Sequence, residues 1–355
     1  MANSEQLESA EVSHQIYLQR LASGTASKLN PVLEDFGKWV RRRILSEGET
    51  IETKKALNAL LKDVNERMSG DLNGWVDLLQ SDLDNLAGYE PQFQAKLIDS
   101  AITNEDFSAN IPATSQVISA ASNNPLVLGA NNSAVSYQGY IDSYTKQQVS
   151  QAASIISGGF SQGQTTAAIS SNLLNNGLVK SSREGFTLAK TTTNHMAAIA
   201  KDKTFRENSD VVIGYVIVAT LDSKTSDICK FHDGQEVKWS DGYQPMPPFH
   251  YNCRTTTSPL INGKYSFDDS SATRASVGDS GAKQVSAKDT YYSWLKKQDA
   301  ELQNEALGQE RAAIFRNAGL SASEFRNASN TRMGKPLTID EMAKKDDRIA
   351  EYLKK

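Results

Sequence analysis

Apolar residues recur every three to four positions through the first hundred residues. The recurrence is clearest at Leu57, Leu60, Leu61, Val64 and Met68, and again at Leu72, Trp75, Val76, Leu79, Leu83 and Leu86. This i, i+3, i+4, i+7 spacing places the side chains on one face of a helix. Gly70 and Gly88 stand where helix caps or breaks are expected. The pattern predicts a helical N-terminal domain over residues 1–110.

The next segment, residues 111–182, combines a connector with further helices. Residues 111–138 are rich in Ala, Ser, Asn and Pro, whereas helical periodicity resumes after residue 140. Gly159, Ser161 and Gly163 match the G-x-S-x-G pattern of a hydrolase nucleophile elbow. That motif requires a buried strand before the serine. A helical pattern precedes it here, so we predict a turn between two helices.

Residues 183–262 predict a compact α+β module. The stretch 183–208 has helical spacing, with Leu188, Thr192, His195 and Ile199 on one face, so His195 is expected to be packed. A Val- and Ile-rich run at 211–220 follows and is the clearest strand of the chain. It leads directly into a stretch rich in cysteine and histidine.

The rest of the chain is predicted to be a linker over 263–285 and a helical C-terminal tail over 286–355. The linker is polar and rich in small residues. In the tail, Thr338 and Glu341 have the spacing of a capping box, which predicts a short last helix. The expected fold class is therefore α+β and mostly α, with a small module between a helical N-terminal region and a helical tail.

Composition and charge narrow the class of protein. The 355 residues carry a formal net charge of −4, a poor match for a protein that coats nucleic acid. The beginning of the chain lacks the pattern of a signal peptide, and no apolar run reaches membrane-spanning length. Two cysteines in this length fit a reducing compartment. We therefore expect a globular protein that is not attached to a membrane.

The candidate chemistry lies between residues 225 and 259. Both cysteines of the chain and two of its four histidines are here, as Cys229-x2-His232 and His250-x2-Cys253. Paired thiolate and imidazole ligands at this short spacing are typical of a structural zinc site. A disulfide is the weaker alternative, because it would leave both histidines unexplained. The predicted metal ligands are therefore Cys229, His232, His250 and Cys253, with zinc as the structural cofactor.

The order of motifs resembles the phage head morphogenesis family, the Mu F-like minor head proteins. The matching residues of the module are Ala189, Lys190, Thr191, Thr192, Asn194, Asp222, Thr225, Cys229, Gly234, Pro247, Pro248, His250, Asn252, Cys253 and Arg254. The matching residues of the tail are Tyr292, Trp294, Leu295, Gln298, Leu307, Gly308, Arg311, Phe325, Leu337, Thr338, Ile339, Asp340 and Glu341. The resemblance covers residues 140–355, and its most specific element is P-P-x-H-x-N-C-R at 247–254.

The chain departs from this family pattern at two positions. Many relatives carry a further cysteine where Ser226 stands, and an arginine is usual where Lys190 stands. If the module binds a metal, His232 would have to replace the missing cysteine.

The resemblance implies a minor head protein of a tailed bacteriophage with no catalytic residues and no enzymatic activity. Such a protein acts at the portal vertex in head morphogenesis and in DNA packaging or delivery. The implied partner is the portal protein, with coat or scaffold proteins and weakly bound packaged DNA as further partners. The implied location is the virion head, after assembly in the host cytoplasm.

The aromatic residues at 291–295 would form an interface patch, unless they pack on the chain's own helices.

Two other functions remain as alternatives. A metal-dependent nuclease of the ββα-metal type needs a histidine base and further ligands on a following helix. No histidine follows His250, and the next segment lacks helical spacing. A zinc-knuckle nucleic-acid-binding protein needs basic and aromatic side chains around the knuckle. Lys230, Trp239 and Arg254 could supply them, but nearby acidic residues offset their charge.

Overall fold

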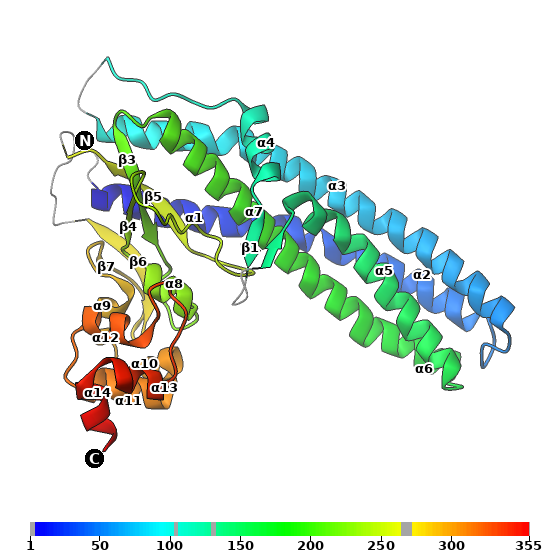
Figure 1. Cartoon of the computed structure of the whole chain (residues 1–355). Helices are drawn as coiled ribbons and strands as arrows, with labels where there is room; N and C mark the ends of the chain where they lie inside the picture. Colours follow the sequence, from blue (N-terminus) through cyan, green and yellow to red (C-terminus); the bar gives the residue numbers. More distant parts are fainter. Residues whose placement is uncertain (1–3, 103–105, 129–132, 264–271, 355) are drawn as a thin grey trace.

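Helices make up most of the part of the chain that the structure describes. The computed structural model describes residues 4–102, 106–128, 133–263 and 272–354. Long helices form one end of an elongated molecule, small antiparallel sheets lie beside them, and short helices form a C-terminal lobe (Figure 1). The predicted α+β fold class, mostly α, is confirmed. None of the described helices combines the length and apolar character needed to cross a membrane.

The helical end is a bundle whose members come from both sides of the predicted boundary at residue 110. Its helices are α1 (Ser4–Ser27), α2 (Leu29–Leu45), α3 (Lys54–Ala101), α5 (Tyr137–Ser161), α6 (Thr166–Asn172), the π-helix η1 (Leu173–Leu178) and α7 (Val179–Glu207). Helix α3 packs along α5 and α7, and α1 packs along α7. Leu60, Ile141 and Leu188 belong to one continuous core. The N-terminal helices therefore have no core separate from that of residues 137–207.

Helix α3 runs unbroken from Lys54 to Ala101, through both predicted breaks. Gly70 is exposed, and a side chain there would meet no neighbouring atom, so nothing in the packing interrupts the helix. The apolar stripe continues on both sides at a mean period close to 3.6 residues, and its burial against α5 and α7 outweighs the low helix propensity of glycine.

The Val- and Ile-rich run forms strand β3 (Val212–Val218), as predicted. It is the central strand of an antiparallel sheet ordered β4-β3-β5, in which β4 is Glu236–Lys238 and β5 is Thr256–Ile261. Helix α1 covers β5. His195 is buried in α7, as expected, with its ring stacked on Tyr137.

The predicted connector contains regular secondary structure, and the rejected nucleophile elbow is a turn. This segment contains helix α4 (Thr114–Asn123) and the short paired strands β1 (Leu126–Leu128) and β2 (Ser133–Val135). Helix α5 ends at Ser161 and α6 begins at Thr166, with Gly163 at a φ of +64° between them. The predicted helix–turn–helix junction is confirmed.

The predicted linker over 263–285 is wrong for its second half. Strands β6 (Thr273–Gly278) and β7 (Gly281–Ser286) form a hairpin there, while residues 264–271 lie outside the described part. Arg274 explains why this polar segment is ordered. Its guanidinium is buried and donates to Asp233 Oδ1 at 3.0 Å, and Asp233 also accepts the backbone N–H groups of Ala219 and Tyr291. This buried pair joins the hairpin, the module and the tail.

The tail is helical, as predicted, and forms a lobe with its own core. Its helices are α9 (Tyr291–Lys296), α10 (Ala300–Leu307), α11 (Gln309–Asn317), α12 (Ala322–Ser329), α13 (Ile339–Lys345) and α14 (Asp347–Leu353). Thr338 and Glu341 form the predicted capping box. Tyr291, Tyr292, Trp294 and Leu295 are buried inside the lobe, so the alternative that they pack on the chain's own helices is confirmed.

A buried ionic cluster ties α1 to α3, α7 and β5. The ammonium group of Lys201 contacts the carboxylate of Glu11 and donates to Thr256 Oγ1 at 2.6 Å. It lies 3.8 Å from Glu90, whose other oxygen is 2.6 Å from Nε2 of His14. All four charged or titratable side chains are at most 5% exposed. The attraction between them is therefore little screened by solvent.

Candidate metal centre

Two segments carry the candidate ligands, and both lie at the end of the sheet where β3 ends and β5 begins. Cys229 lies on the short helix α8 (Asp227–His232), which follows β3 after a turn. His250 and Cys253 lie on the loop that leads into β5. Because β3 pairs with β5, the sheet brings α8 and this loop together.

Helix α7 fixes the loop that carries His250 and Cys253. Asn252 adopts a left-handed conformation with φ 57°, and its backbone N–H donates to Thr191 Oγ1 at 3.2 Å. The amide group of Asn194 donates to the carbonyl oxygen of Cys253. From the sequence, Thr191, Asn194 and Asn252 are known only as residues that match the family pattern. The structure gives them a positioning role that their spacing could not reveal.

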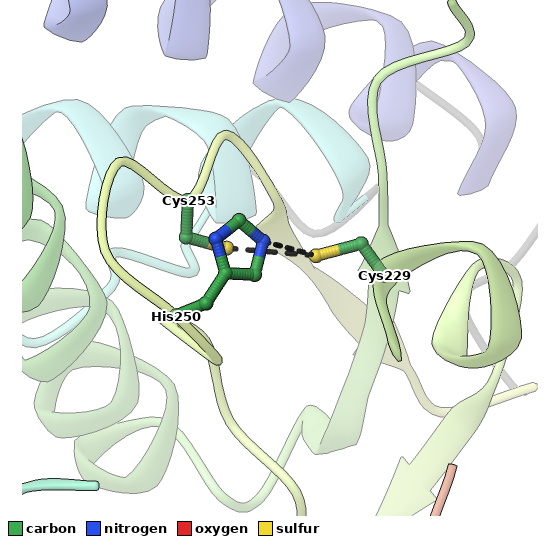
Figure 2. Close-up of side chains that lie close together, drawn as sticks. All are labelled: Cys229, His250 and Cys253. Atoms are coloured by element: carbon green, nitrogen blue, oxygen red, sulfur yellow. Dashed lines mark hydrogen bonds between the residues drawn. The ribbon is translucent and has the colours of Figure 1, made fainter. Parts of the chain in front are cut away.

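Cys229, His250 and Cys253 bring three ligand atoms together. The Sγ atom of Cys229 lies 3.2 Å from Nε2 of His250 and 3.7 Å from Sγ of Cys253 (Figure 2). Two thiolates on one tetrahedral zinc ion, with Zn–S bonds of about 2.3 Å, would be about 3.8 Å apart. Both cysteines are free thiols, and a disulfide would need sulfurs about 2.05 Å apart. The donor set and its spacing therefore fit a zinc ion.

The histidine is oriented for a metal ligand. Nδ1 of His250 lies 2.8 Å from the carbonyl oxygen of Tyr251, which can accept its hydrogen. That tautomer leaves the lone pair of Nε2 directed toward the sulfurs. Backbone carbonyls commonly fix metal-binding histidines in this way.

The pKa values of the two thiols are shifted in opposite directions. Burial raises the pKa of Cys229 well above its ordinary value, and Cys253 acts in the same direction. Burial also opposes ionisation of Cys253, but hydrogen bonds with Cys229 and His250 outweigh it and hold the pKa of Cys253 well below its ordinary value. Burial disfavours the charged form of His250, yet its interactions with Cys253 raise the pKa of that imidazole. Without a metal, the arrangement thus favours a thiolate at Cys253 beside an imidazolium at His250.

Comparison with protein families identifies the region that contains this site. Residues 147–258 match the family model described as Phage Mu protein F like protein. Over these residues the chain is similar to the Mu F-like proteins. The match runs from α5 through α7, β3 and α8 into β5, and includes all three clustered ligands. It supports a phage head morphogenesis protein, as the motifs predict. No curated protein and no solved structure matches the chain.

The fourth predicted ligand of the Mu F-like region, His232, does not join this group. Among the described residues, the cluster of candidate ligands is Cys229, His250 and Cys253. Nδ1 of His232 lies 2.7 Å from Oε1 of Gln235, and its ring stacks on Phe249 with centroids 4.8 Å apart.

His232 instead packs against the C-terminal lobe. A Cβ atom added at Gly334 would stand 3.1 Å from Nε2 of His232, so this glycine allows the tail to approach the ring closely. Burial lowers the pKa of His232 and favours the neutral ring. His232 therefore has the x2 spacing of a ligand pair with Cys229 but serves in packing. Sequence alone could not distinguish these two roles.

A further polar residue, Ser226, lies close to Cys229 in the candidate metal centre. Its hydroxyl oxygen is buried and has no hydrogen-bond partner in the structure. Ser226 is the N-cap residue of α8, three positions before Cys229, so the two side chains lie on the same side of this helix. Structural zinc sites are almost always four-coordinate. This chain supplies three protein ligands and, beside Cys229, one polar residue.

Proposed function

We propose that this chain is a minor head protein of a tailed bacteriophage that acts at the portal vertex in head morphogenesis and in DNA packaging or delivery. The observation that carries the proposal is the Mu F-like match over residues 147–258, which contains the whole candidate metal centre. The protein would reside in the virion head after assembly in the host cytoplasm.

Within this proposal, zinc at Cys229, His250 and Cys253 has a structural role. When bound, zinc would supply a cross-link between α8 and the loop before β5. The residues around the site support this role, because Asn194 and Thr191 already hold the loop on α7. Cys229 and Cys253 are 2% and 0% exposed, so a substrate has little access to the two thiols.

The proposal includes no catalytic activity. Hydrolysis needs a nucleophile, a base and an orienting group within reach of a substrate. His250 is engaged by Cys229 and by the carbonyl of Tyr251. Ser161 ends a helix and is followed by a turn, without the strand that a nucleophile elbow requires.

The side chains around the site argue against the nucleic-acid-binding alternative. Lys230 is buried, and its ammonium group donates to the carbonyl of Ala306 at 2.5 Å and to Asp227 at 2.9 Å. Trp239 is covered by the guanidinium of Arg206, 4.3 Å from the ring centroid. These groups are therefore occupied within the protein. With a net charge of −4, the drive toward free DNA from counterion release is small.

The portal protein of the same phage is the proposed principal partner, with coat, scaffold and packaged DNA as weaker ones. Co-expression with that portal, followed by affinity purification of the full-length chain at physiological salt, tests this. Full-length protein is needed, because a chain ending at residue 262 would lose Arg274 and Tyr291 and leave Asp233 buried with fewer partners.

We expect the portal to be retained and duplex DNA to remain unshifted in a parallel mobility assay. Loss of the portal together with a shift of duplex DNA would replace the head-assembly proposal with the nucleic-acid alternative. Retention of neither partner would also contradict the portal proposal.

A further inference from the structure

A groove outside the candidate metal centre lies between α1 and the hairpin β6–β7. It encloses about 830 Å³, a volume within the range of ligand-binding clefts. Val218, at the end of β3, also lines it. Its apolar lining includes Val12, Ile16, Val218, Leu221, Ala275 and Val277.

The apolar side chains at the rim of this groove are open to solvent. Ile16 on α1 is 43% exposed, and Val277 on β6 is 51% exposed. Side chains alternate between the two faces of a strand. Arg274 and Ser276 point to the buried face of the hairpin, so Ala275 and Val277 belong to the face that lines the groove. An apolar surface between a helix and a hairpin suits the side chains of a docked segment.

Several polar side chains of the groove already have partners inside the protein. Gln15 and Gln19 both donate to Oδ1 of Asn194, at 3.0 and 3.1 Å. Arg254 donates to both carboxylate oxygens of Asp222, one of them at 2.8 Å. A small polar ligand would therefore meet few available hydrogen-bonding groups. The groove is better suited to a peptide that binds through apolar contacts.

The charges left at the rim are positive. Arg20 on α1 and Lys283 on β7 line the groove and are exposed. Neither has an ion-pair partner within 4 Å among the described residues. Asp222 is neutralised by Arg254, and this pair holds the pKa of the aspartate below its ordinary value despite burial. The rim is thus locally basic on a chain whose net charge is negative.

We propose that this groove docks a peptide segment of a partner protein that carries apolar side chains next to acidic ones. The apolar residues would pack between Ile16 and Val277, and the carboxylates would face Arg20 and Lys283. Complementary charge at a rim favours the correct partner and speeds its association. The inference does not depend on the portal as partner, and it concerns a surface separate from the metal ligands.

Selection from a display library of random linear peptides on the full-length protein tests the proposal. We expect the enriched peptides to combine apolar with acidic residues. The best peptide is then synthesised, and its dissociation constant is measured by fluorescence anisotropy with wild type and variants. Val277→Asp and Ile16→Asp, both at exposed positions, should weaken binding at least about tenfold, because each places an unpaired carboxylate at the apolar contact. Lys283→Glu should weaken binding and reduce its dependence on salt.

Matched controls carry the same changes elsewhere. Val179→Asp alters an apolar residue that is 44% exposed on α7, and Arg41→Glu reverses an exposed charge on α2. Both should bind the peptide as wild type does, and all variants should unfold at the wild-type temperature. The proposal is overturned if no peptide is enriched, if basic peptides are enriched, or if Val277→Asp binds as tightly as Val179→Asp.

Discussion

The sulfur atoms of Cys229 and Cys253 lie 3.7 Å apart, although the residues are 24 positions apart in the chain. That distance is too long for a disulfide and close to the separation of two thiolates that share a tetrahedral zinc ion. Nε2 of His250 completes a triangle of ligand atoms within 4.8 Å of one another. The geometry favours a metal over an oxidised pair.

The first prediction distinguishes the three clustered ligands from His232, which has only the sequence spacing of a ligand. Protein purified without chelators should hold about one zinc ion per chain, measured by elemental analysis. Cys253→Ala should remove the metal, because it deletes a thiolate from the cluster. His232→Ala should retain it, since His232 packs against Phe249 and Gly334 instead.

Zinc should also dissociate as the pH falls, because protons compete for the thiolates and the imidazole. Wild-type protein with less than about a tenth of an equivalent of metal would contradict the metal centre. Loss of zinc from His232→Ala would instead restore the four-ligand set predicted from sequence.

The second prediction concerns the position beside Cys229. Ser226→Cys should increase zinc affinity at least about tenfold, because it offers a third thiolate where a buried hydroxyl has no partner. Competition with a chelator of known affinity measures the change. Ser226→Ala is the matched control and should leave the affinity within about threefold of wild type. Equal affinities for the Cys and Ala variants would show that position 226 does not face the metal.

The sequence located the region of the candidate ligands but did not show which of these residues lie together. The clustering of Cys229, His250 and Cys253 was sufficient to predict a metal centre, since thiolate and imidazole in short pairs suit zinc. It could not exclude His232, because the direction of that ring depends on Gly334, about a hundred residues later. The anchoring of the loop by Thr191 and Asn194 likewise depends on contacts that spacing does not encode.

The third prediction tests the buried ionic cluster. Lys201→Met should lower the free energy of unfolding by about 3–5 kcal/mol, because it leaves Glu11 and Glu90 without their shared cation. Lys203→Met removes an exposed helix pair with Glu207 and should change stability by less than about 0.5 kcal/mol. Chemical denaturation of both variants provides the comparison. Similar values for the two would mean that the cluster contributes little to stability.

The fourth prediction is a pH dependence at Glu8. Burial raises the pKa of this carboxyl from 4.5 to about 7; nearby Arg274 opposes the shift, whereas Asp233, Glu5 and Glu236 add to it. The folded state therefore keeps a proton that the unfolded state releases, so the contribution of Glu8 to stability is lost as pH rises from 4.5 to about 7.

Glu8→Gln should remove this part of the pH dependence. The variant should gain about 1–2 kcal/mol over wild type above pH 7, because a neutral amide avoids the cost of burying a charge at this partly exposed site. The gain should disappear below pH 4.5, where the carboxyl is protonated in both states. Parallel stability curves for the two proteins across this range would contradict the assignment.

The limits of the fold prediction have the same physical origin. Local patterns identified β3, α7 and the capping box at Thr338, because each depends on residues close in sequence. Gly70 and the hairpin β6–β7 were misjudged, since α3 stays intact through packing on α5 and α7, and the hairpin is held by the pair Arg274–Asp233. Such long-range contacts override local propensity.

If the chain is the minor head protein that we propose, the most direct test is quantitative mass spectrometry of proheads purified from the phage whose genome encodes it. We predict that the chain is present in an amount similar to or below that of the portal protein and far below that of the coat protein. Absence of the chain from proheads, or an amount equal to that of the coat protein, would contradict a minor head protein at the portal vertex.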